Sequence, residues 1–153
     1  LWICNPHNPT GQLWCRASLQ PLLERYALVI CDEAFLPLVP NGEQQSLIPL
    51  VAEHSNLVVI RSLTKLYGIA GLRLGYAVAQ PQRLQRWAEW RDPWPVNGIA
   101  LAVGERLLAS PRSRYGREVL WSVAKPSPDS RNFSRMLHCV ASPDRPGGSV
   151  LRI

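Results

Sequence analysis

The sequence has no long hydrophobic run, no secretion signal and no paired cysteine motif. No apolar stretch reaches the ~18 residues that a membrane-spanning helix needs, so we expect no membrane segment. The opening string LWICNPHNPTG has no basic region followed by an apolar one, so we do not expect it to be a secretory signal. It also has no initiating methionine and begins within a strand-like run, so we expect further sequence upstream of Leu1.

The four cysteines form no CxxC pair and share no metal-ligand spacing with the three histidines. Three of the four lie in or beside apolar runs. Buried, reduced thiols are therefore the favoured interpretation, and disulfides or a zinc site the less favoured one. This usage predicts a cytoplasmic protein without a metal site. The cysteines are Cys4, Cys15, Cys31 and Cys139.

Positive charge is concentrated in the second half of the chain. The 153 residues carry a net charge of +6, and 46% of them are hydrophobic, which is enough for a folded core. Residues 1–82 hold five basic and five acidic groups, whereas residues 83–153 hold twelve and six. A basic half can bind nucleic acid. The chain lacks a helix-turn-helix, zinc or aromatic-interleaved signature, so a nucleic-acid-binding module stays the weak alternative and we expect no nucleic-acid partner.

The order of apolar runs and helical patterns predicts an α/β fold with a mostly parallel sheet flanked by helices. Helical spacing indicates a helix over 18–26, with Ser18 as its N-cap and Pro21 in its first turn. From residue 125 onward the sequence is rich in proline, serine and arginine, so residues 125–153 are predicted to be a poorly defined tail. The strand-like runs are 1–4, 27–31, 57–60 and 72–79, and the other helix candidates are 81–91, 98–109 and 112–124.

Polar clusters follow three of the predicted strands, at residues 5–11, 32–35 and 61–65, and Arg73 enters the fourth strand. Ligands of α/β sheets gather at the carboxyl ends of the strands. A single aspartate there is often only a cap, and a single lysine is usually solvated. An acid, a lysine flanked by hydroxyls and an arginine at one edge instead suit pyridoxal phosphate. Its aldehyde needs an amine, its ring nitrogen a carboxylate, and its phosphate guanidinium and hydroxyl donors.

The strings NPHNPTG, CDEAF and RSLTKLYGIAGLRLGYAVA resemble the consecutive signatures of the class I/II aminotransferases, the fold-type I pyridoxal-phosphate enzymes. The resemblance covers residues 1 to about 110. It implies that residues 1–124 are part of the large, cofactor-binding domain of such an enzyme. It also implies a homodimer for the intact protein, and a fragment without activity of its own for this chain.

The resemblance further implies a catalytic pair and a set of cofactor-binding side chains. Lys65 would form the Schiff base with the cofactor and then move a proton, and Asp32 would keep the pyridine nitrogen protonated. For Asn97 the resemblance leaves open an approach to the cofactor or a loop cap, and Arg152 is too weak a candidate for the substrate carboxylate to assign. The cofactor-binding set adds Asn8 at the phenolic oxygen, Ser62 and Arg73 at the phosphate and, more weakly, Thr64.

Phe35 is a departure from many aminotransferases of the family, which have tyrosine three residues after the aspartate. The strings DEAF, SLTKLYGIAGLRLGY and WRDPWPVNGIALA most resemble the threonine-phosphate decarboxylases of cobalamin synthesis. Histidinol-phosphate aminotransferases are their near relatives and remain the alternative. The expected substrate is a small amino acid or its phosphate ester.

Overall fold

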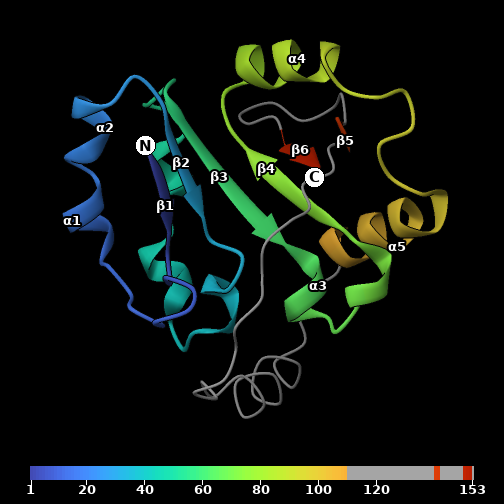
Figure 1. Cartoon of the computed structure of the whole chain (residues 1–153), viewed down its shortest axis with the longest axis horizontal. Coiled ribbons are helices and arrows are strands. Elements are labelled where there is room, and N and C mark those ends of the chain that lie inside the picture. The colour runs from blue at the N-terminus through green and yellow to red at the C-terminus, as the bar shows by residue number, and fades with distance from the viewer. Residues whose placement is uncertain (110–139, 142–149, 153) are drawn as a thin grey trace.

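The computed structural model describes residues 1–109, 140–141 and 150–152. They form one sheet with the strand order β1-β2-β3-β4-β6-β5. β1, β2 and β3 are parallel to one another, whereas β4 runs antiparallel to β3 and the two short strands β6 and β5 continue beyond it (Figure 1). The α/β prediction is confirmed. The strands are β1 (Trp2–Cys4), β2 (Val29–Asp32), β3 (Leu57–Ser62), β4 (Gly75–Val78), β5 (Val140–Ala141) and β6 (Val150–Arg152).

Each of the four predicted strands is present, but the fourth is shorter than the apolar run suggests. Residues Ala70–Leu72 form the 3-10 turn η4, and Arg73 follows it in the left-handed region with φ 51° and ψ 57°. A residue in that conformation cannot continue an extended strand. β4 therefore begins only at Gly75.

The predicted helix over 18–26 is wrong as a single element. Two short helices stand in its place, α1 (Arg16–Leu19) and α2 (Leu22–Arg25), and Pro21 is the N-cap of the second. Proline has no N–H for a bond to the preceding turn, so it separates two helices here rather than lying in the first turn of one. Ser18 lies within α1 and donates its hydroxyl to the Cys15 carbonyl at 2.8 Å, so it is not the predicted N-cap.

The two later helices are confirmed. α4 spans Pro81–Glu89, and α5 spans Gly98–Ala109. The helix predicted over 112–124 lies outside the described residues. The remaining short elements are α3 (Leu63–Leu66), η1 (Leu36–Leu38), η2 (Gly42–Gln45) and η3 (Ile48–Leu50).

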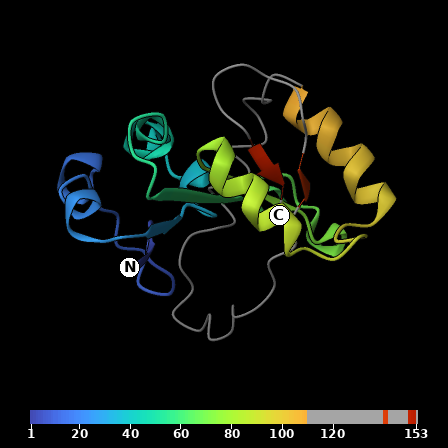
Figure 2. The ribbon, with the colours of Figure 1, turned by 90° about the horizontal axis from the view of Figure 1, so that it is seen from above.

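Two apolar clusters cover the two faces of the sheet. The larger one packs Val29, Cys31 and Val59 against α1, α2 and the segment after η2. The smaller one packs Val58 and Ile60 against Leu84 of α4. Figure 2 shows α1 and α2 at one end of the sheet and α5 at the other. The central strands β2 and β3 are therefore packed between the two clusters.

The cysteine prediction is confirmed in part. Cys31 is buried and Cys4 is half-buried, but Cys15 is exposed in front of α1, and none of the three is in a disulfide. Cys139 lies outside the described residues. Within the described part of the chain no cluster of histidine, cysteine or acidic side chains could hold a metal, and no helix is long and apolar enough to cross a membrane.

Replacing Gly42 with alanine should destabilise the fold by about 2 kcal/mol. Gly42 is buried, and an added Cβ would lie 2.4 Å from the Leu36 carbonyl oxygen, which is backbone and cannot turn away. Urea unfolding of the two proteins measures the difference. Gly98→Ala is the matched control because nothing lies within 4 Å of its added Cβ. Equal losses at both positions would contradict the steric argument.

Candidate functional site

The carboxyl ends of β1, β2 and β3 lie at one edge of the sheet, because the three strands are parallel. In register, Cys4 pairs with Asp32, and Asp32 pairs with Ile60. β4 is antiparallel and begins at this edge, with Gly75 opposite Ser62. Figure 1 shows α3 following β3 at the same end. The polar clusters after the three strands and Arg73 before β4 therefore converge, as the sequence predicts.

Lys65, Ser62 and Thr64 are in direct contact. Ser62 is the extended residue in front of α3, and one helical turn brings the Lys65 amine back over it. The Lys65 Nζ donates to the Ser62 Oγ at 3.1 Å, and the Ser62 and Thr64 hydroxyls share a bond of 2.8 Å. Thr64 is buried and the other two side chains are half-buried. The arrangement is local in sequence, since all three residues lie within four positions.

The Lys65 amine lies over the Phe35 ring, 5.6 Å from its centroid, within the range of a cation–π contact. Burial lowers the pKa of Lys65, the negative charge of Asp32 opposes that shift, and the positive charge of Arg73 adds to it. A lowered pKa increases the neutral fraction of the amine, which is the form that attacks a carbonyl. The surroundings of Lys65 therefore favour the neutral form of its amine.

Asp32 ends β2 as a half-buried carboxylate, and its Oδ1 accepts the Ala34 N–H at 3.0 Å. The neighbouring Cys4 donates its thiol to the Pro6 carbonyl at 3.3 Å. Burial raises the pKa of Cys4, a hydrogen bond from the Asn8 backbone lowers it, and the charge of Asp32 raises it. Asn8 and Asp32 thus both lie close to the same thiol. Asn8 joins the edge through its backbone.

Arg73 and Asn97 use their side chains locally. Arg73 is exposed and donates its Nη1 to the Ala70 carbonyl at 2.8 Å, while its charge still acts on Lys65. Asn97 accepts the Ala100 N–H at 2.8 Å on its Oδ1, which caps the start of α5. Of the two alternatives for Asn97, the structure supports the cap.

The largest feature that the sequence does not predict is a buried ion pair between Arg61 and Glu33. The Arg61 side chain is 1% exposed and that of Glu33 is 0% exposed. Burial raises the pKa of Glu33, an effect that the charge of Arg61 opposes. Burial would lower the pKa of Arg61, but the hydrogen bonds that Arg61 donates to Glu43 and the charge of Glu33 raise it overall. One signal for the pair was present. An arginine inside the apolar run LVVIRS requires a buried partner.

The sequence profile of the aminotransferase class I and II family matches residues 1–122, which is most of the chain. The chain belongs to this family. It is 40% identical over 107 residues to a putative threonine-phosphate decarboxylase of Caldanaerobacter subterraneus, with 67% of the chain and 29% of the relative aligned. It is also 40% identical over 107 residues to a histidinol-phosphate aminotransferase of Symbiobacterium thermophilum, with 68% and 29% aligned. The chain thus spans less than a third of the length of these two family members.

Solved structures of the family agree with this fold. The L-threonine-O-3-phosphate decarboxylase from Porphyromonas gingivalis matches with a TM-score of 0.63 and 32% identity, over 70% of this chain and 34% of that one. The histidinol-phosphate aminotransferase from Sinorhizobium meliloti, solved with pyridoxal-5'-phosphate, matches with a TM-score of 0.69 and 26% identity, over 80% and 34%. Both resemblances support a fold-type I pyridoxal-phosphate architecture.

The donor set at the sheet edge fits pyridoxal phosphate chemically. The edge offers an amine with a lowered pKa, a carboxylate, two linked hydroxyls and an exposed guanidinium. These are the groups that an aldehyde, a pyridine nitrogen and a phosphate require. No other described side chain offers a lysine amine, because the chain has two lysines and Lys125 is outside the described residues.

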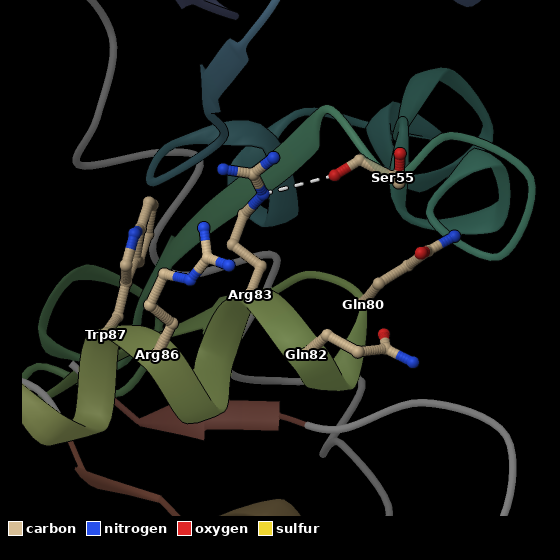
Figure 3. Close-up of a pocket in the computed structure, with 6 residues that line it drawn as sticks. All are labelled: Ser55, Gln80, Gln82, Arg83, Arg86 and Trp87. Atoms are coloured by element: carbon tan, nitrogen blue, oxygen red, sulfur yellow. Dashed lines mark hydrogen bonds between the residues drawn. The ribbon is translucent and has the colours of Figure 1, made fainter.

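A shallow pocket at the opposite end of the sheet is separate from this edge. Figure 3 shows Arg83, Arg86 and Trp87 projecting from the same side of α4, and Arg83 donates its Nε to the Ser55 carbonyl at 3.1 Å. Ser55 and Gln80 lie at the amino end of β3 and the carboxyl end of β4. The pocket shares no residue with the family's cofactor motifs.

Charge changes at Asp32 and Arg73 should move the reactivity of Lys65 in opposite directions. Arg73→Gln removes a cation that lowers the pKa of Lys65, so that pKa rises and the neutral fraction at pH 7 falls. Asp32→Asn removes an anion that raises the pKa, so the neutral fraction grows. Rates of lysine modification by an uncharged acylating reagent, measured against pH, report both shifts. Shifts of the same sign in the two variants would contradict this electrostatic account.

Proposed function

We propose that this chain is the lysine-bearing part of a pyridoxal-phosphate enzyme that acts on an amino acid or its phosphate ester. The observation that carries the proposal is the contact set of Lys65, Ser62 and Thr64 beside Asp32 at one sheet edge. Family membership makes the same cofactor the expected ligand. The chain's short span relative to its family means that the activity belongs to the intact enzyme, which we propose to be a homodimer.

Each residue at the edge has a distinct task in this proposal. Pyridoxal phosphate supplies an electron sink for a bond broken at the substrate Cα. Lys65 would hold the cofactor through its amine, and the same amine would move a proton at the substrate Cα. Asp32 would hold a proton on the ring nitrogen by a charge-assisted hydrogen bond. The hydroxyls of Ser62 and Thr64 and the Arg73 guanidinium would bind the phosphate, and the Asn8 side chain would donate to the phenolic oxygen.

For the reaction, we propose decarboxylation of L-threonine O-3-phosphate, with histidinol-phosphate transamination as the alternative. One observation favours the decarboxylase, since Phe35 offers Lys65 a ring face without a hydroxyl. A putative threonine-phosphate decarboxylase is also among the relatives at 40% identity. The equal identity to a histidinol-phosphate aminotransferase keeps the second reaction in view. The orientation in which the substrate is bound decides which bond at Cα breaks. The cofactor-binding residues at the edge can therefore serve either reaction.

Reconstitution with pyridoxal phosphate tests the cofactor assignment. The purified chain is incubated with the cofactor and reduced with borohydride, and the modified peptide is identified by mass spectrometry. We expect the modification on Lys65. A folded sample that carries no modification there would overturn cofactor binding by this chain.

Protection by substrate amines tests the reaction class. An amine that replaces Lys65 on the cofactor protects Lys65 from borohydride trapping. We expect L-threonine O-3-phosphate to protect at a lower concentration than L-histidinol phosphate does. The reverse order would favour the aminotransferase, and L-threonine without its phosphate serves as the control for amine reactivity alone.

A further inference from the structure

A buried side-chain network joins the ends of β2 and β3, next to the residues of the proposed cofactor site. Glu33 directly follows Asp32, and Arg61 directly precedes Ser62. The Arg61 Nη2 and Glu33 Oε2 are 2.7 Å apart, and both side chains are almost wholly shielded from solvent. We call these two residues the Arg61–Glu33 clamp.

The two side chains of the clamp form further hydrogen bonds with residues 43–47. The Arg61 guanidinium donates to the two carboxylate oxygens of Glu43 at 2.9 and 3.0 Å, and to the Ser46 hydroxyl at 2.9 Å. Glu33 accepts the Ser46 hydroxyl at 2.8 Å and the Leu47 N–H at 2.7 Å. The network therefore fixes the directions of both side chains and ties β2, β3 and residues 43–47 together.

The position of the clamp along the strands gives it a geometric consequence. The backbone ladder between β2 and β3 extends to the bond from the Glu33 N–H to the Ile60 carbonyl, 2.9 Å long. Beyond this bond the two segments of the chain diverge. The segment after β2 continues through Phe35 into η1, and the segment after β3 continues into α3. Phe35 and Lys65 nevertheless meet at 5.6 Å. The clamp is the side-chain link between the two diverging segments at the point where they separate.

Burial of two charges is not explained by stability alone, because apolar side chains of similar volume often stabilise a core equally well or better. A planar guanidinium with several fixed donors instead imposes direction. We propose that the Arg61–Glu33 clamp is a positioning element that holds Asp32 and Phe35 in register with Lys65. Its meaning for catalysis rests on the proposed function, but the register itself is a property of the chain without cofactor.

Lys65 itself can report the register. In a Lys125→Arg background Lys65 is the single lysine, so ¹³C-reductive methylation and NMR titration give its pKa without any cofactor. We expect the double variant Arg61→Met/Glu33→Leu to move that pKa upward, since burial is the main influence that lowers it and a loosened segment exposes the amine. Arg61→Lys keeps the charge but loses the planar fork, and we expect a smaller upward shift of the Lys65 pKa in that variant.

Asn56→Ala is the control for a variant that lowers the stability of the fold without changing the positions of Asp32 and Phe35 relative to Lys65. Its side-chain amide donates to the Leu23 and Tyr26 carbonyls, both at 2.7 Å, at the far end of β3. We expect a lower melting temperature and no change in the pKa of Lys65. An unchanged pKa in both clamp variants, or an equal shift in Asn56→Ala, would overturn the positioning role. The titration uses no cofactor, so failure of the parent chain to capture pyridoxal phosphate would count against the proposed function and not against the clamp.

Discussion

Replacing Lys65 with arginine should abolish covalent capture of pyridoxal phosphate by this chain. Arginine keeps the positive charge on a side chain slightly longer than that of lysine. Its guanidinium stays protonated at any pH a protein tolerates, so it offers no nucleophilic amine to the aldehyde. The borohydride-reduced adduct on the peptide that contains residue 65 should fall to background, while the melting temperature stays close to that of the parent because the side chain is half-buried at a sheet edge.

The matched control is Lys125→Arg, which removes the other lysine of the chain. That variant should keep the full adduct on Lys65. The α-amine of Leu1 also reacts with aldehydes, and peptide mapping separates it from the two lysines. An adduct that persists in Lys65→Arg, or that disappears equally in Lys125→Arg, would show that capture by this chain is nonspecific. In that event the geometry at the sheet edge would have no role in binding.

The composition of the edge that carries Lys65 could be predicted from strand direction and from local backbone geometry. Parallel strands place their carboxyl ends together, so three polar clusters far apart in sequence had to converge. Ser62, Thr64 and Lys65 lie within one helical turn, so their contact follows from local backbone geometry. The direction of β4 was less accessible, since its apolar run does not say whether it pairs parallel or antiparallel with β3.

The clamp could not be predicted in the same way because its partners are distant in sequence. Glu33 and Arg61 are 28 positions apart, and Arg61 and Glu43 are 18 apart. A buried arginine needs an acidic partner, but the chain has eleven acidic residues and no local pattern selects among them.

Pro21 shows a different limit of prediction, in which a local signal is present but has two possible meanings. Its chemistry permits both a helix start and a helix break, and the structure shows both, because α1 ends at Leu19 and Pro21 is the N-cap of α2.

Replacing Arg61 alone with methionine should destabilise the fold by about 3–5 kcal/mol, because removal of one member leaves a buried charge without its partner. Glu33 would remain buried, and its carboxylate would keep neutral donors alone, the Ser46 hydroxyl, the Leu47 N–H and the Cys31 thiol. Domains of this size have about 5–15 kcal/mol of stability in total, so a large part would be lost. Urea unfolding measures the difference. The double variant Arg61→Met/Glu33→Leu should lose much less, since it buries no charge.

The pH dependence of the stability lost in Arg61→Met distinguishes two explanations, an unpaired buried charge on Glu33 and a simple loss of packing. Burial already raises the pKa of Glu33, and the charge of Arg61 opposes that rise, so removal of Arg61 raises the folded-state pKa further. A carboxyl that binds its proton more tightly in the folded state adds stability in acid, and that stability is lost as the pH rises through the folded pKa. The free energy of unfolding of Arg61→Met should therefore be closest to that of the double variant at low pH, and should drop further below it as the pH approaches neutrality. A gap between the two variants that stays constant with pH would mean that the methionine disturbs packing, and that Glu33 does not carry a buried charge at neutral pH.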